Sequence, residues 1–250
     1  MHESAMRIGA EFLNTSWKTG MRRILEIGAM DVNGSLRIHT PQNAEWTGVD
    51  LEPGPGVDVV VEAGKPLPFQ DDTFDLVLAT SVLEHDPRFW ETISEMARVA
   101  NPNGLIYLNA PSGGVFHRYP LDHFRFYPDA GMAFLEIIRQ QRPQAILRES
   151  FIANQDTAGF NDFVAVYALD GDTDGEQIWP KESVSNVWSN GEFLQETLIE
   201  QPEFHMDLHS ARLELEQTRT ELAKMSKQYQ DVVNSKTWRY LERIRRLLFR

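Results

Sequence analysis

The sequence of 250 residues contains no cysteine. This absence excludes a disulfide framework, a thiol nucleophile, an iron–sulfur cluster and a thiolate zinc site. No apolar run approaches the ~20 residues that a membrane span requires. The first residues also lack the basic stretch followed by an apolar stretch that marks a secretory signal. We therefore expect a cytoplasmic protein.

Basic residues are scarce, and their distribution is uneven. The chain has 24 Lys and Arg against 37 Asp and Glu, a net charge of −13. The last fifteen residues carry six basic residues and one acidic residue, a net charge of +5, so the preceding 235 residues carry −18. Because Lys and Arg supply the phosphate contacts that dominate nucleic-acid affinity, we expect no nucleic-acid partner for this acidic body.

Short apolar runs alternate with helical patterns as far as residue 170, and this alternation is typical of a doubly wound α/β sheet covered on both faces. The pattern predicts helices over residues 1–20, 34–39, 89–99 and 130–140. It predicts strands over residues 24–28, 46–50, 57–62, 74–79, 105–110, 145–152 and 163–169. We assign residues 1–170 to this domain.

The composition changes after Asp170. Residues 171–176 are acidic and turn-rich, and we assign 171–203 to a linker and connecting segment. From residue 204 the chain has heptad spacing, with one seam at Leu208, Leu215, Leu222 and Tyr229 and the other at Ala211, Thr218, Met225 and Val232. This spacing predicts a coiled coil over 204–235 that forms a homo-oligomer. The alternative is a single helix packed on the body.

Acidic residues stand at the ends of successive predicted strands. Glu26 is followed by Gly28 at the end of the first strand, where a carboxylate accepts hydrogen bonds from an amino group and a glycine permits close approach of a ligand. Asp50 ends the second strand, in position for both hydroxyls of a ribose. The third strand ends at Glu62 and Ala63, where an adenine would lie.

Together with Leu67-Pro68-Phe69, the run from Asp71 to Asp75, and Leu83-Glu84-His85, this ordered set resembles the class I S-adenosylmethionine-dependent methyltransferases over residues 22–170. The resemblance implies a Rossmann-like, doubly wound sheet of seven strands and S-adenosyl-L-methionine as cofactor. By carry-over, the methionine part lies at Glu26 and Gly28, the ribose at Asp50, and the adenine at Leu51, with Glu62 and Ala63 at its edge. Ser81 borders the cofactor.

The sequence departs from this family at the loop after the first strand. The family pattern is G-x-G-x-G, whereas here Gly28-Ala29-Met30-Asp31-Val32 lacks two of the glycines. We therefore expect the loop to follow a different path. A nicotinamide dehydrogenase is disfavoured, because G-x-G-x-x-G is absent and Glu26 would crowd a pyrophosphate.

A second cluster follows the fifth predicted strand, from Phe116 to Asp129. Its aromatic and charged residues suit a polyhydroxylated ligand, and we assign acceptor contacts to Arg118, Tyr119 and Arg125. Methylation of a hydroxyl requires a general base, for which His117 is the first candidate, oriented by Asp122, and His123 is the second. The alternative is a core-packed lid with structural histidines.

This run resembles an "H-R-Y-P-x-D-x-x-R-F-Y-P-D-A" segment in methyltransferases of bacterial surface-polysaccharide clusters. Outside it, His85 lies near the expected position of the donor methyl group, and we assign it to acceptor binding. The alternative is that His85 caps the next helix. His205 and His209 are spaced i,i+4, but no third ligand is evident, so no metal site is expected.

The basic segment 236–250 has an apolar stripe at Leu241, Ile244 and Leu248, with arginines beside it. Such a helix can lie in a membrane interface, where basic residues strengthen its binding to an anionic leaflet. It resembles the "S-x-S/T-W-R" ending that follows coiled coils in many bacterial polysaccharide glycosyltransferases. The segment predicts peripheral contact with the inner membrane or a glycosyltransferase. The alternatives are a cap on the coiled coil and a docking helix.

These features together predict an S-adenosylmethionine-dependent methyltransferase that O-methylates a sugar of a bacterial surface glycan or its lipid-linked precursor. One alternative is a non-catalytic scaffold, with a degenerate methyltransferase fold, in a polysaccharide assembly complex. Another is a quinone or small-molecule methyltransferase, because that type shares Leu83-Glu84-His85.

Overall fold

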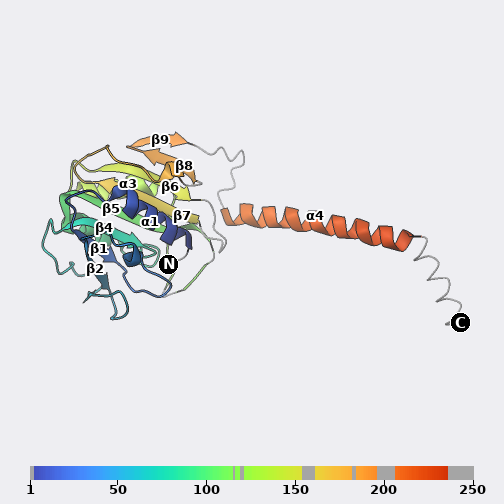
Figure 1. The fold of residues 1–250 in the computed structure, drawn as a ribbon, viewed down its shortest axis with the longest axis horizontal. Helices are drawn as coiled ribbons and strands as arrows, with labels where there is room; N and C mark the ends of the chain where they lie inside the picture. The colour runs from blue at the N-terminus through green and yellow to red at the C-terminus, as the bar shows by residue number, and fades with distance from the viewer. Residues whose placement is uncertain are drawn as a thin grey trace. The chain divides into compact units, whose positions relative to one another are not determined.

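The computed structural model describes residues 3–114, 116–118, 121–153, 161–181, 184–195 and 206–235. These residues fall into two units, one within residues 1–200 and the other within residues 201–250. The first unit is an α/β body, and the second contains the long helix α4 (Met206–Asn234) (Figure 1). Within the described residues, no helix combines the length and the apolarity needed to cross a bilayer.

The body is built on one mixed sheet. Its strands are β1 (Arg23–Ile27), β2 (Glu45–Asp50), β3 (Val59–Val60), β4 (Phe74–Thr80), β5 (Ala100–Gly113), β6 (Ile146–Ala153), β7 (Asn161–Ala168), β8 (Val184–Ser189) and β9 (Glu192–Gln195). Their order across the sheet is β3-β2-β1-β4-β5-β7-β6-β8-β9, with β2 and β9 toward opposite edges in Figure 1. The first five strands pair in parallel and the other pairings are antiparallel.

The parallel half of the sheet contains a topological switch point. The chain runs outward from β1 through β2 to β3, and then returns to place β4 and β5 on the other side of β1. In open α/β sheets, ligands bind outside the carboxyl ends of the strands at such a point. The site is therefore expected beyond the carboxyl ends of β1 and β4.

Helices cover both faces of the sheet. On one face lie α1 (Glu3–Ser16) and the 3₁₀ helix η1 (Leu36–His39), where Phe12 stacks on Tyr107 of β5 at 4.5 Å between ring centroids. The other face is covered by α2 (Phe89–Val99) and α3 (Ala130–Arg139). Burial of each large apolar side chain in these two layers contributes about 2 kcal/mol.

The seven predicted strands overlap β1 to β7, and the four predicted helices overlap α1, η1, α2 and α3. The sheet nevertheless has nine strands among the described residues, so the expected count of seven is wrong. The extra strands come from residues 171–203, which the sequence assigned to a linker. This segment contributes η2 (Trp179–Lys181) and the hairpin β8–β9, and β8 pairs with β6.

Buried contacts hold this added segment on the body. The Glu149 carboxylate on β6 accepts hydrogen bonds from the backbone amides of Ile178 and Trp179, at 2.9 and 3.0 Å. The Trp188 indole of β8 donates to Asp129, the residue before α3. The side chains of Ile178 and Val187 are fully buried. The boundary at residue 170 therefore divides a single packed unit.

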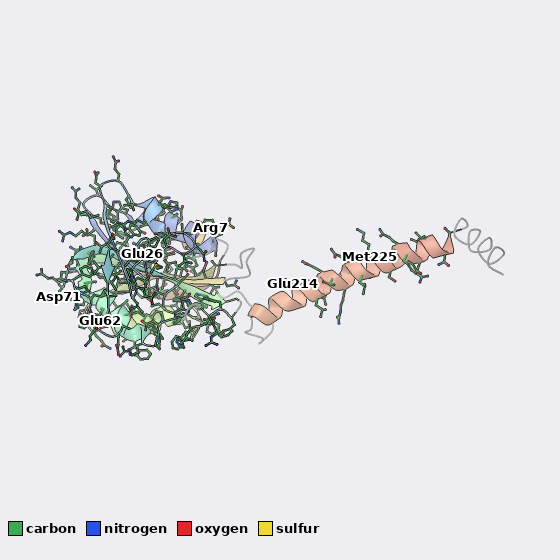
Figure 2. All side chains as sticks on the ribbon, turned by 90° about the horizontal axis from the view of Figure 1, so that it is seen from below. Arg7, Glu26, Glu62, Asp71, Glu214 and Met225 are labelled. Atoms are coloured by element: carbon green, nitrogen blue, oxygen red, sulfur yellow. The ribbon has the colours of Figure 1, made fainter. Side chains whose placement is uncertain are left out.

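Helix α4 is continuous over the predicted heptads. Leu215, Leu222, Met225, Tyr229 and Val232 are each 50–67% exposed along it. Figure 2 shows the Met225 side chain projecting from this helix. The predicted basic segment 236–250 lies outside the described residues.

Candidate active site at the carboxyl ends of the strands

Gly28 directly follows β1 and begins the loop at the carboxyl end of that strand. Its φ of +72° is a left-handed conformation, and a Cβ added there would lie 2.2 Å from Val82 Cγ2. The amides of Gly28 and Ala29 both donate to the Val49 carbonyl of β2. A glycine is needed here for its conformation and for its close contact with the segment after β4.

Backbone hydrogen bonds hold the loop after Gly28, and its expected departure from the family's path stays a prediction. The Met30 amide donates to Asp50 Oδ2 at 3.0 Å, and the Asp31 amide donates to the Pro55 carbonyl at 2.9 Å. Two glycines lie on the facing loop. A Cβ at Gly54 would lie 2.2 Å from Met30 Sδ, and a Cβ at Gly56 would lie 2.4 Å from the Ala29 carbonyl oxygen, so neither position has room for a side chain.

Asp50 lies at the carboxyl end of β2 and is half-buried. Its Oδ2 accepts from the Met30 amide and its Oδ1 from the Leu51 amide at 2.7 Å. Next to it, Leu51 has 57% of its surface exposed, and Glu62 and Ala63 beyond β3 are also exposed. The Asp50 carboxylate, held by two backbone amides, therefore lies next to the exposed apolar side chain of Leu51.

Glu26 is buried in the body (Figure 2), with 2% of its surface exposed. Its Oε2 accepts a hydrogen bond from the Trp46 indole at 3.0 Å. Burial raises the pKa of Glu26 to about 7, against smaller lowering effects from the Trp46 hydrogen bond and the Arg37 charge. The assignment of this side chain to direct cofactor contact stays a prediction; in the structure its carboxylate is buried and bonded to the Trp46 indole.

Ser81 follows β4 in a left-handed conformation, with φ of +56°. Its amide donates to the Asn109 carbonyl of β5 at 2.9 Å. A non-glycine residue in this region is strained, and such strain concentrates at functional sites. The turn directs the following residues, including Glu84 and His85, across the end of the sheet.

The structure brings His117 and Asp122 together, as the sequence predicts, and adds His85. His117 Nδ1 lies 3.4 Å from Asp122 Oδ2, and His117 Nε2 lies 3.3 Å from His85 Nε2. The other ring nitrogen of His85 bonds to the Leu121 carbonyl. Burial lowers the pKa of His85, which favours its neutral form.

Arg125 holds Asp122 in place. Its guanidinium makes two hydrogen bonds to the carboxylate, one of them 2.6 Å long from Nη2 to Oδ2. The hydrogen bonds from this guanidinium are the main reason why the pKa of Asp122 falls to about 2. Arg125 was predicted to bind the acceptor, but in the structure its charge is directed at Asp122.

Backbone contacts bring this loop to the ends of β4 and β5. The amides of His123 and Phe124 donate to the Glu84 carbonyl, and the Phe126 amide donates to the Pro111 carbonyl. Beneath the loop, Phe124 and Phe126 pack on Phe89. For these two aromatics the alternative of a core-packed lid is correct.

The remaining predicted residues of this loop are the acceptor residues Arg118 and Tyr119 and the second base candidate, His123. Arg118 and His123 are exposed, as are the aromatic residues Phe116 and Tyr127. Tyr119 lies outside the described residues. The loop thus exposes two aromatic and two basic side chains to solvent, while Phe124 and Phe126 of the same loop pack on Phe89.

Sequence reasoning missed the contact between His85 and His117 and the place of Glu84 beside them. Glu84 Oε1 lies 3.6 Å from His85 Nε2, and the Glu84 residue is 1% exposed. The sequence held one signal, because Leu83-Glu84-His85 directly follows a strand that ends at the switch point.

Comparison with known proteins agrees with the fold. Residues 18–108 match the protein family described as "Methyltransferase domain". A methyltransferase of Mycobacterium marinum is 42% identical over 76 residues, which cover 28% of this chain and 29% of the relative. One of Mycobacterium leprae is 37% identical over 89 residues, 34% of this chain and 32% of the relative. The chain thus spans about a third or less of these relatives.

Among solved structures, the 1,6-didemethyltoxoflavin-N1-methyltransferase of Burkholderia thailandensis is similar, with a TM-score of 0.51 and 17% sequence identity. The similarity covers 66% of this chain and 78% of that one. At this identity the likeness concerns the fold alone. Residues 18–108 are therefore similar to a methyltransferase domain, and the body around them has a Rossmann-like fold shared with S-adenosylmethionine-dependent methyltransferases.

Proposed function

We propose that the protein uses S-adenosyl-L-methionine to O-methylate a sugar hydroxyl of a bacterial surface glycan or its lipid-linked precursor. One observation carries the proposal: Asp50 at the end of β2 and the His85–His117 pair beyond β4 and β5 lie at the same edge of the parallel sheet. A ribose-binding acid and a proton acceptor are the two groups that such a reaction requires.

The residues present at this edge fit the cofactor. Each carboxylate oxygen of Asp50 accepts one amide, and because a carboxylate oxygen has two lone pairs, both oxygens retain capacity for ribose hydroxyls. The exposed Leu51 side chain offers an apolar surface for an adenine. Because Gly28 has no side chain, the backbone at this position can approach the cofactor closely. When bound, the cofactor supplies an electrophilic methyl group on a positively charged sulfur.

The histidine pair performs the proton chemistry. An unprotonated ring nitrogen of the pair accepts the proton of the acceptor hydroxyl, so that the oxygen can form its new bond to carbon. Asp122, held ionised by Arg125, lies beside His117 and stabilises the imidazolium that results. The exposed side chains of Phe116 and Arg118 offer a ring-stacking surface and hydrogen-bond donors to a sugar.

The test is transfer of a labelled methyl group from S-adenosylmethionine to three acceptors: a lipid-linked oligosaccharide, a free polysaccharide and a quinol. We expect label in the sugar-containing acceptors and its loss in His117→Gln. Label in the quinol alone would replace the proposal by small-molecule methylation, with which the fold is equally compatible. No transfer to any acceptor, together with no cofactor binding, would favour a scaffold.

We also propose that the α4 helices of separate copies associate in parallel. The apolar heptad positions from Leu215 to Val232 are exposed along the helix, which supports a partner on that seam. In a parallel register, Glu214 at position g faces Arg219 at position e of the next heptad, so the charges are complementary. The basic segment 236–250 is proposed to contact the inner membrane surface or a glycosyltransferase from the cytoplasmic side.

A further inference from the structure

Three side chains beyond β4 and β5 direct nitrogen and oxygen atoms at one another. Ligand atoms of Glu84, His85 and His117 all lie within 4.8 Å of one another. The two Nε2 atoms are 3.3 Å apart, and Glu84 Oε1 lies 3.6 Å from His85 Nε2. Bonds of about 2.0–2.1 Å from a zinc ion to each nitrogen give a separation of this size in tetrahedral geometry.

Both imidazoles are oriented through their second nitrogens. His85 Nδ1 bonds to the Leu121 carbonyl, and His117 Nδ1 faces the Asp122 carboxylate at 3.4 Å. A histidine that ligates a metal almost always has a carbonyl or a carboxylate on its other nitrogen, because this contact fixes the tautomer and the ring orientation. Arg125 in turn donates a hydrogen bond to Asp122, so the carboxylate that faces His117 is itself held in position.

From this geometry we propose that Glu84, His85 and His117 bind a divalent transition-metal ion of the zinc type. Two imidazoles and a carboxylate favour zinc, cobalt or nickel, whereas magnesium and calcium require oxygen ligands. Three protein ligands are the number found in catalytic zinc sites, which keep a further position open. Metal binding does not depend on which acceptor is methylated.

This metal site lies where the proposed function places the acceptor hydroxyl, so a bound ion would affect how that hydroxyl is deprotonated. With the ion bound, a hydroxyl oxygen at the open position ionises more easily because the positive charge lowers its pKa, and its proton passes to water. The histidines then act as ligands rather than as proton acceptors. The competing interpretation of the same geometry is a pair of imidazoles that shares one proton and binds no metal.

The experiment is metal titration of the full chain without a histidine tag, after removal of metals with a chelator. We expect one Zn²⁺ per chain, no displacement by a large excess of Mg²⁺, and visible absorption bands when Co²⁺ replaces Zn²⁺. The variants His85→Gln and His117→Gln should each weaken binding at least 100-fold, and Glu84→Gln at least tenfold. The control is His39→Gln, because His39 is an exposed histidine on η1 and should leave binding unchanged.

A second readout covers variants that do not fold. An ion that binds only the folded state raises the melting temperature of a protein. Zn²⁺ should therefore raise the melting temperature of the intact protein, and the chelator should reverse this rise. Absence of stoichiometric uptake, or uptake that persists in both histidine variants, would overturn the proposal and leave the proton-sharing pair. Neither result decides whether a methyl group is transferred to a sugar, because the labelled-acceptor assay tests that separately; the metal result decides only whether the histidines act as ligands or as proton acceptors.

Discussion

At the scale of single residues, Glu26 couples the fold to pH. In the unfolded chain its pKa is near the ordinary 4.5, and in the body burial raises it to about 7. The folded state therefore binds the proton more tightly. Stability from this group is present below pH 4.5, declines as the pH rises from 4.5 to 7, and changes no further above that range.

We predict that Glu26→Gln flattens this decline. The amide retains an acceptor for the Trp46 indole but cannot ionise, and a shift of this size corresponds to about 3 kcal/mol. Urea unfolding at pH 5 and pH 8 measures the difference, with the exposed substitution Glu52→Gln as the control. If the unfolding free energy fell by the same amount between pH 5 and pH 8 in Glu26→Gln and in the intact protein, ionisation of Glu26 would not be the cause of the decline.

Gly28 is a second residue with a measurable role. Gly28→Ala should lower the unfolding free energy by about 3 kcal/mol, because the new methyl group meets Val82 Cγ2 in a left-handed backbone. Gly191→Ala is the matched control, since Gly191 has φ of +80° and nothing within 4 Å of an added Cβ. Its cost is backbone strain alone. If both variants lost the same unfolding free energy, the contact with Val82 would not be the cause of the loss in Gly28→Ala.

The sequence predicted the residues at strand ends better than those on the long loop. Asp50 was found because acids at the ends of consecutive parallel strands share one edge of a sheet. The contact between His85 and His117 depends instead on the return of residues 121–126 to the Glu84 carbonyl. That return is a tertiary contact with no local sequence signal. Burial of Glu26 depends likewise on Trp46, twenty residues away.

At the scale of elements, the hairpin β8–β9 is what the sequence prediction lacked. Asn190 and Gly191, both with positive φ, form the two-residue turn between these strands. Asn-Gly between two strands is the strongest short-range hairpin signal. It was overlooked because residues 184–189 mix polar and apolar side chains without strict alternation and follow an acidic, turn-rich stretch.

We predict that a chain ending at residue 170 is less stable than one ending at residue 200. The shorter chain leaves the β6 edge unpaired and removes the amides that hold the buried Glu149. An open edge strand also promotes aggregation. Thermal unfolding with light scattering should show a lower melting temperature and aggregation for the shorter chain. Identical melting curves would restore the predicted boundary.

Helix α4 supports a prediction about association. Leu222→Lys should reduce the fraction of oligomer, because it places a charge in the proposed apolar seam. Sedimentation of the full chain measures this, and Lys224→Ala at the neighbouring position outside the seam is the control. A single species at the mass of one chain for the intact protein would contradict the parallel association.

At the scale of the whole molecule, we propose separate tasks for the two units. The body holds the residues that match a methyltransferase domain and the proposed catalytic groups. The second unit holds the exposed heptad seam, and the basic segment follows it. The length and order of the strands made the α/β class predictable from sequence, whereas the acceptor depends on a few side chains of one loop.

The most direct test of the central claim is calorimetric titration of S-adenosylhomocysteine into the full chain and into Asp50→Ala. We expect micromolar binding to the intact protein and at least a tenfold loss in the variant, because Asp50 is the carboxylate that we propose binds the ribose hydroxyls. Glu52→Gln, two residues away and exposed, should bind as the intact protein does. No binding to the intact protein, or equal binding to Asp50→Ala, would contradict the account.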